Sequence, residues 1–196
     1  MRFILGVIVG IAGFLAVGYL AATSGRISVA ATNHGGINDT IDRWLGEVSD
    51  RSIEKHAPQK TNPFANDPGA LAVGLSHYKE NCLDCHGARS IDGAEFSKGL
   101  NPAPPMLDMK GTQKMSDGQL FWIVSNGIRM TGMPAFSPTH SEAEIWKIVA
   151  FVHHLPQLTD AEIARLKQGR EEQEEHHKEA GGPAGESGHP GGPAHS

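Results

Sequence analysis

The chain has 196 residues, a net charge of -5 and 39% hydrophobic residues, which suffices for one domain of ordinary size with extensions but not for two large cores. The acidic excess lies mostly in the tail, since residues 68–158 carry 7 basic and 8 acidic side chains whereas residues 159–196 carry 4 and 8. No basic face is apparent, so the composition argues against nucleic acid as a partner.

Residues 3–22 are a mostly apolar run without a charge, flanked by Arg2 and Arg26. As a helix rising about 1.5 Å per residue, this run would span roughly 30 Å, the thickness of the hydrocarbon core of a bilayer. A cleaved signal peptide is the alternative, because Val-Ala-Ala at 29–31 could serve a peptidase, although the apolar region of a signal is usually about 7–15 residues. We assign residues 1–25 to a transmembrane anchor or signal segment, and its length favours the anchor. In either case the rest of the chain is expected to be exported.

Residues 26–66 are polar and interrupted by glycine and proline, which is typical of a tether. Within this segment Ile41, Trp44, Leu45 and Val48 recur at helical spacing. The pattern predicts a short amphipathic helix that packs on the main domain or lies on the membrane surface.

The main domain is predicted to begin at Asp67, a favourable N-cap, with Pro68 in the first helical position, where its missing N–H costs nothing. One stripe of this helix carries Leu71, Leu75, Tyr78 and Cys82. The helix therefore presents its apolar face and the first cysteine on the same side.

After the cysteines, residues 87–114 show no helical or strand period and contain several prolines, so we interpret them as loop. Ser116 and Gln119 then form a capping box that opens a short helix ending at Gly127.

A second capping box, Ser141 with Glu144, opens the most strongly patterned helix of the chain, which ends before Pro156. A third, Thr159 with Glu162, opens a polar helix. The remaining tail is rich in Gly, Pro, Glu and His and has too little apolar surface to offset the entropy of ordering. We therefore predict an all-α domain at 67–158, followed at 159–196 by a polar helix and a disordered tail.

Cys82 and Cys85 are the only cysteines, and His86 follows directly. A structural zinc site would need a second cysteine pair or two spaced histidines, and neither pattern accompanies the motif. A thioredoxin-like dithiol would lie at the start of a helix that follows a strand, whereas this pair comes at the end of a predicted helix. Both interpretations are therefore disfavoured.

Haem attachment accounts for the whole motif. Two thiols three positions apart can add to the two vinyl groups of one porphyrin, and a histidine directly after the second is placed to bind the iron. Attachment would also use both cysteines of an exported chain. We expect one covalent haem c, held by Cys82 and Cys85, with His86 as an axial ligand of the iron.

The second axial ligand decides the function, because a strong ligand favours electron transfer and an open position favours the binding of small molecules. Met133 is the best candidate: it lies between two predicted helices, in a loop that Gly132 allows to approach closely and Pro134 stiffens. Met130 is the alternative ligand. An ordinary packing role is the alternative for Met133.

These features resemble the class I cytochromes c, and the resemblance covers roughly residues 68–158. Members have a first helix with glycine and an aromatic residue ahead of the first cysteine, and Gly74 and Tyr78 stand at those positions. The last helix of the family presents an aromatic residue to that glycine, as Phe151 would here. A small residue against a ring also suits a steep helix crossing.

The resemblance implies further residue roles. In the family, a proline carbonyl accepts the Nδ1–H of the haem-ligating histidine, which assigns this role to Pro105, with Pro104 as the alternative. The segment around Met133 resembles the bacterial branch related to small haem subunits of respiratory oxidases and dehydrogenases, which supports Met133 as the sixth ligand.

From these observations we expect an electron carrier rather than an enzyme: a membrane-anchored monohaem cytochrome with His/Met ligation. It would exchange electrons with redox partner proteins in a periplasmic respiratory chain, or be the haem subunit of an oxidoreductase. Its haem domain would lie in the periplasm, anchored to the inner membrane, or be soluble if the N-terminal segment is cleaved. The alternative is a gas-binding or sensory haem protein with a displaceable sixth ligand. Metal binding by the tail histidines is a secondary hypothesis, based on His176, His177, His189 and His195.

Overall fold

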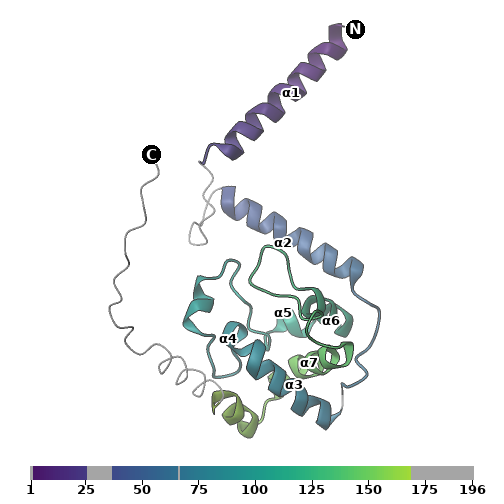
Figure 1. Ribbon diagram of the computed structural model, residues 1–196, viewed down its shortest axis with the longest axis vertical. Helices are drawn as coiled ribbons and strands as arrows, with labels where there is room; N and C mark the ends of the chain where they lie inside the picture. The colour runs from purple at the N-terminus through teal and green to yellow at the C-terminus, as the bar shows by residue number, and fades with distance from the viewer. Residues whose placement is uncertain (1, 26–36, 66, 169–196) are drawn as a thin grey trace, which may run out of the picture.

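The computed structural model describes residues 2–25, 37–65 and 67–168, and over these residues the chain is helical, with no strand (Figure 1). The prediction of an all-α fold is confirmed. The helices are α1 (Arg2–Thr23), α2 (Ile37–His56), α3 (Pro68–Asn81), α4 (Leu83–His86), η1 (Glu95–Gly99), α5 (Lys110–Gln113), α6 (Asp117–Asn126), α7 (Glu142–His154) and η2 (Leu155–Gln157). Residues 160–168 are also helical. The predicted disordered tail beyond residue 168 lies outside the described residues.

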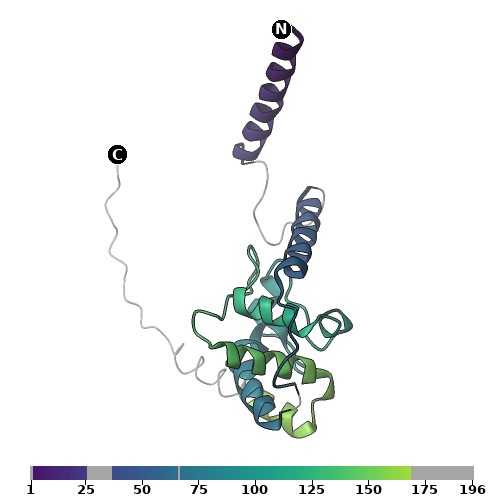
Figure 2. The same cartoon turned by 90° about the vertical axis from the view of Figure 1, so that its right-hand side faces the viewer.

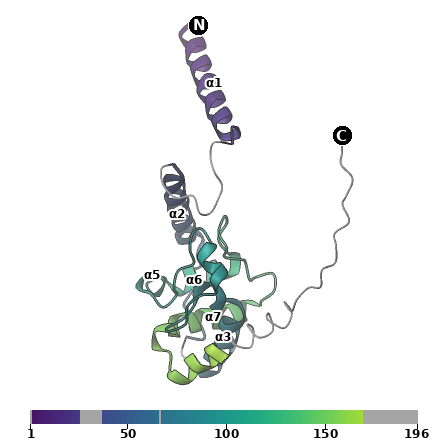
Figure 3. The same ribbon diagram turned by 90° about the vertical axis from the view of Figure 1, so that its left-hand side faces the viewer.

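Helix α1 stands apart from the other helices in all three views (Figures 1, 2 and 3). Residues Phe3–Thr23 have a mean hydropathy of 2.4, and none of the apolar window is covered by the rest of the described chain. The helix is long and apolar enough to cross a bilayer. A signal sequence would have the same properties, so the choice between anchor and signal stays a prediction.

The core of the domain is the crossing of α3 and α7. Asp67 caps α3 by accepting a hydrogen bond from the backbone of Gly69, as its sequence predicts. At the crossing, a Cβ placed on Gly74 would lie 2.6 Å from Cβ of Phe151 and would also meet the backbone of Lys147. The side chains of Tyr78 and Phe151 are both fully buried, and the centroids of their rings lie 5.4 Å apart. The glycine therefore allows two helices to approach more closely than any side chain would permit.

Local capping signals set the other helix ends. The boxes at Ser116 and Ser141 both form, with each hydroxyl accepting from the backbone three residues on. The box at Thr159 forms as well and opens residues 160–168, in which Leu166 is fully buried. This last helix is therefore docked on the core rather than a free polar extension.

Helix α2 is longer than the short helix predicted from the sequence, and its apolar residues are divided between two environments. Ile53 is 3% exposed and belongs to the core, whereas Trp44 is 61% exposed. The stripe predicted from the sequence is mostly solvent-facing, because the side of α2 that meets the domain is the one that carries Leu45, Ser49 and Ile53. Figures 1 and 2 show the N-terminal end of α2 leading away from the domain.

The segment after α2 is held against the domain by specific contacts. The Asn62 side chain donates to the carbonyl of Trp146 over 2.7 Å, and the Asn62 backbone donates to Asp117 over 2.7 Å. A Cβ on Gly118 would overlap the carbonyl of Pro58. The end of the predicted tether is therefore part of the packed unit. Similarly, the predicted loop 87–114 contains the short helices η1 and α5.

Candidate functional site

The Cys82–His86 turn lies where α3 ends and α4 begins. Cys82 is both the C-cap of α3 and the N-cap of α4, and its carbonyl accepts from the backbone N–H groups of Cys85 and His86. Gly87 ends the turn with φ at 59°, and a Cβ there would lie 2.5 Å from the carbonyl oxygen of Ile91. The Tyr78 hydroxyl donates to the Gly87 carbonyl over 2.6 Å. These contacts fix both cysteines and the histidine on one short turn.

The two cysteines are not joined in a disulfide, and both thiols are favoured in the uncharged, protonated form. Burial, with a smaller effect from Cys85, raises the pKa of Cys82 to about 12. Burial and the nearby Asp84 carboxylate raise the pKa of Cys85 as well. A redox dithiol needs a lowered thiol pKa, so this pair is poorly suited to that chemistry. Within the described part of the chain, no three His, Cys, Asp or Glu side chains are grouped to hold a metal ion.

The His86 ring is oriented by a backbone carbonyl 19 residues along the chain. Its Nδ1 donates to the carbonyl oxygen of Pro105 over 2.7 Å. Burial lowers the pKa of His86, and the hydrogen bond to Pro105 opposes this effect only in part. The imidazole is thus favoured in its neutral form, with Nδ1 protonated and the Nε2 lone pair available to a metal. Of the two proline candidates, Pro105 makes this contact.

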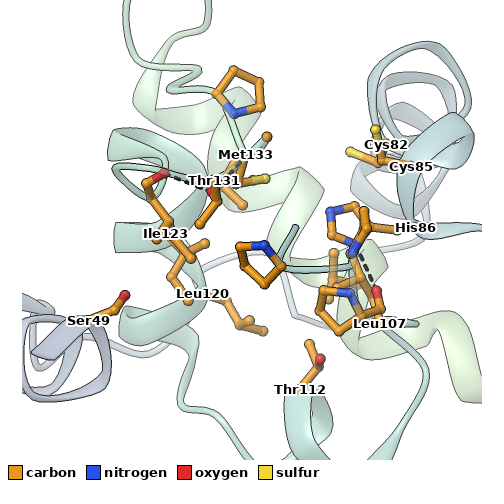
Figure 4. A pocket seen from close by; sticks show the side chains of 18 of the residues that line it. Ser49, Cys82, Cys85, His86, Leu107, Thr112, Leu120, Ile123, Thr131 and Met133 are labelled. Atoms are coloured by element: carbon orange, nitrogen blue, oxygen red, sulfur yellow. Dashed lines mark hydrogen bonds between the residues drawn. The ribbon is translucent and has the colours of Figure 1, made fainter. Parts of the chain in front are cut away.

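The residues described so far, Cys82, Cys85, His86 and Pro105, line a cavity of about 290 Å³. In Figure 4, His86 and Met133 face the cavity from opposite sides, and Cys82 and Cys85 lie together at one end. The remaining wall is mainly apolar and comes from several elements. It includes Ile53, Leu100, Leu107, Met115, Leu120, Ile123, Val124, Ile128, Phe136 and Val152.

Met133 is held in place by its own loop. Its backbone N–H donates to the Thr131 hydroxyl over 3.1 Å, and its carbonyl accepts from the backbone of Ile128 over 3.2 Å. A Cβ on Gly127, whose φ is 65°, would lie 2.7 Å from that same carbonyl oxygen. Met130, the alternative ligand, is 72% exposed and does not line the cavity. The structure therefore brings Met133, and not Met130, to the side opposite His86.

The donor set and the walls fit a c-type haem. Two thiols at one end, a neutral imidazole on one side and a thioether on the other are groups that can hold such a haem, and apolar walls suit the macrocycle. Sequence reasoning missed the contribution of α2, which adds Ser49, Asp50 and Ile53 to the lining. The helical spacing of Leu45, Ser49 and Ile53 was the available signal for this face of α2. Because Ser49 is polar, however, the three residues do not form a recognisable apolar stripe.

Comparison with known proteins shows what the domain is similar to. Residues 69–152 match the family described as cytochrome c oxidase, cbb3-type, subunit III. The cbb3-type cytochrome c oxidase subunit CcoP of Azospirillum sp. (strain B510) is 33% identical over 101 residues, which are 48% of this chain and 31% of that protein. Cytochrome cL from Methylophaga aminisulfidivorans shares 24% identity, with a TM-score of 0.37 over 54% of this chain and 73% of that structure.

Residues 69–152 therefore form a cytochrome c domain, which follows an apolar N-terminal helix that is a candidate membrane span. The predicted resemblance to the cytochrome c family is confirmed. The chain spans about a third of the length of the curated relative.

Proposed function

We propose that this protein transfers single electrons through one covalently bound haem c. Cys82 and Cys85 would form the two thioether bonds, and His86 and Met133 would bind the iron from opposite sides. The observation that carries the proposal is the arrangement of these four residues around one apolar cavity. When bound, the haem iron supplies the chemistry by alternating between its ferric and ferrous states.

The residues around the haem would set its reduction potential. The Pro105 carbonyl orients His86 and makes it a better donor to the metal. The apolar wall would limit the water around the haem, which would disfavour the additional positive charge of the oxidised form. Both effects come from residues that are fixed before any partner arrives, so little rearrangement would accompany each electron transfer.

A gas-binding or sensory role is the competing proposal, and the loop of Met133 argues against it. A displaceable ligand needs a loop that can move away from the iron. Here the backbone of Met133 makes hydrogen bonds through both its N–H and its carbonyl, and Gly127 packs against the same carbonyl. These contacts favour a ligand that stays in place, as electron transfer requires.

The setting that we propose is an inner-membrane protein with its haem domain in the periplasm. Helix α1 would be the anchor, and the partners would be redox proteins of a respiratory chain. The supporting observations are the apolar span Phe3–Thr23 and the similarity of the domain to a subunit of a cbb3-type oxidase. We propose either a haem subunit of such a complex or a tethered carrier that exchanges electrons with it.

The decisive experiment is spectroscopy of the full-length protein purified in detergent after expression with a cytochrome c maturation system. We expect covalent haem after denaturation, and in the oxidised protein the weak far-red absorption band that methionine sulfur gives to ferric haem. Met133→Ala should abolish this band and let carbon monoxide bind the reduced form rapidly. Met130→Ala is the matched control and should retain the band. Rapid carbon monoxide binding by the unaltered protein, together with no far-red band, would refute His/Met electron transfer.

A further inference from the structure

The cavity has a polar end opposite the cysteines. In Figure 4, Ser49 and Thr112 lie at the end away from Cys82 and Cys85. Asp50, which also lines the cavity, follows Ser49 on α2. Of the other polar side chains of the lining, His86 is assigned to the iron in the proposal above, Asn81 donates to the carbonyl of His77, and Thr131 donates to that of Ile128. The polar groups left to face a ligand are therefore concentrated at this end.

The structure of haem indicates which of its groups would lie at this polar end of the cavity. The two vinyl groups that form thioethers lie on one side of the porphyrin, and the two propionate groups lie on the other. Attachment at Cys82 and Cys85 would thus direct the propionates to the end that Ser49 and Thr112 occupy. We propose that α2 closes the propionate edge of the haem, with the Ser49 hydroxyl as hydrogen-bond donor to a propionate and the Asp50 carboxylate as a nearby negative charge. This inference rests on the haem-binding function proposed above.

Packing holds α2 in this position. Ile53, one turn after Ser49, is 3% exposed and lies in the same cavity wall, and Ala57 directly after the helix is buried. The segment beyond is tied to α6 and α7 by the two hydrogen bonds of Asn62. The Asp42 carboxylate near the start of α2 accepts a long hydrogen bond, 3.5 Å, from Asn101. Helix α2 is therefore part of the packed domain rather than a mobile tether.

The two α2 residues should act on the haem potential in opposite directions. A hydroxyl that donates to a propionate offsets its negative charge, and loss of this donor favours the ferric form. A carboxylate beside the propionates adds negative charge, and its removal favours the ferrous form. Because Asp50 is exposed, its effect should weaken as salt screens it.

The test measures the midpoint potential of the full-length holoprotein by spectroelectrochemical titration at low ionic strength. Asp50→Asn should raise the potential and Ser49→Ala should lower it. We expect each change to shift the ferric/ferrous equilibrium by roughly two- to fivefold, which is about 20–40 mV at 59 mV per decade for one electron. Glu54→Gln is the matched control: it removes a charge of the same sign from an exposed position on α2 that does not line the cavity, and it should leave the potential unchanged.

The far-red band of each variant is recorded in parallel, because it reports the axial ligands independently of the potential. Opposite shifts in the two variants, with the band retained and the control unchanged, support the proposal. Potentials of both variants within the range of the Glu54→Gln control would overturn it, and so would shifts of equal sign and size in all three. Failure of the proposed function has a different signature, since the unaltered protein would then lack covalent haem or the far-red band.

Discussion

Replacing Gly74 by alanine tests the crossing of α3 and α7 that supports the cytochrome domain. The added Cβ would lie 2.6 Å from Cβ of Phe151 and would also press on the backbone of Lys147, so neither neighbour can yield by a simple change of rotamer. Overpacking of this kind typically costs about 1–3 kcal/mol. The better helix propensity of alanine returns up to about 1 kcal/mol. We therefore expect the free energy of unfolding to fall by roughly 1–2 kcal/mol relative to the unaltered protein.

Gly46→Ala provides the matched control. Gly46 is also inside a helix, α2, but a Cβ there would meet nothing within 4 Å. Only the propensity gain remains, so this variant should be stabilised by roughly 0.5–1 kcal/mol.

The assay is thermal unfolding of the two holoproteins in detergent, followed by haem absorbance. For a domain of this size, 1 kcal/mol corresponds to about 4–8 °C. We expect the midpoint to fall for Gly74→Ala and to rise for Gly46→Ala. Equal or higher stability of Gly74→Ala would refute the close packing of the two helices at this position.

Two further predictions concern contacts around the site. Tyr78→Phe removes the donor to the buried Gly87 carbonyl and should lower the free energy of unfolding by about 1–3 kcal/mol in denaturant titrations, whereas unchanged stability would show that the contact is dispensable. Burial opposes ionisation of Glu162, but hydrogen bonds from Thr159 and His154 outweigh it and lower the pKa of this carboxyl. Its stabilising effect is therefore present above the unfolded pKa of about 4.3 and is lost as the pH falls through the folded value. The stability difference between the unaltered protein and Glu162→Gln should be largest near pH 7 and vanish in acid; a difference that grows in acid would contradict the sign.

Features that depend on near neighbours in the chain were predictable from the sequence. The N-cap at Asp67 and the capping boxes at Ser116, Ser141 and Thr159 all form where the residues predict them. Each is a contact between groups two or three residues apart, so composition and spacing contain the whole interaction. The Cys82–His86 motif belongs to the same category, because one short turn positions all of its side chains.

Features that depend on distant segments were less accessible. The composition of residues 26–66 predicts a tether, yet Ile53 is in the core and Asn62 donates to a carbonyl 84 residues away. The stripe of apolar residues on α2 did not identify the face that packs on the domain, because Trp44 and Val48 lie on the exposed side. Periodicity shows that a helix has an apolar face, but not which of its faces another segment will cover.

The amino-acid sequence by itself determined the apolar N-terminal helix, the all-α domain and the likeness to cytochromes c, because these follow from hydropathy, helical periodicity and a short motif. The tertiary structure alone decided which proline carbonyl meets His86, which methionine reaches the opposite side of the cavity, and that α2 contributes to the cavity lining. The physical reason is that these contacts join segments 19 or more residues apart, and their geometry is set by packing of the whole core rather than by local spacing.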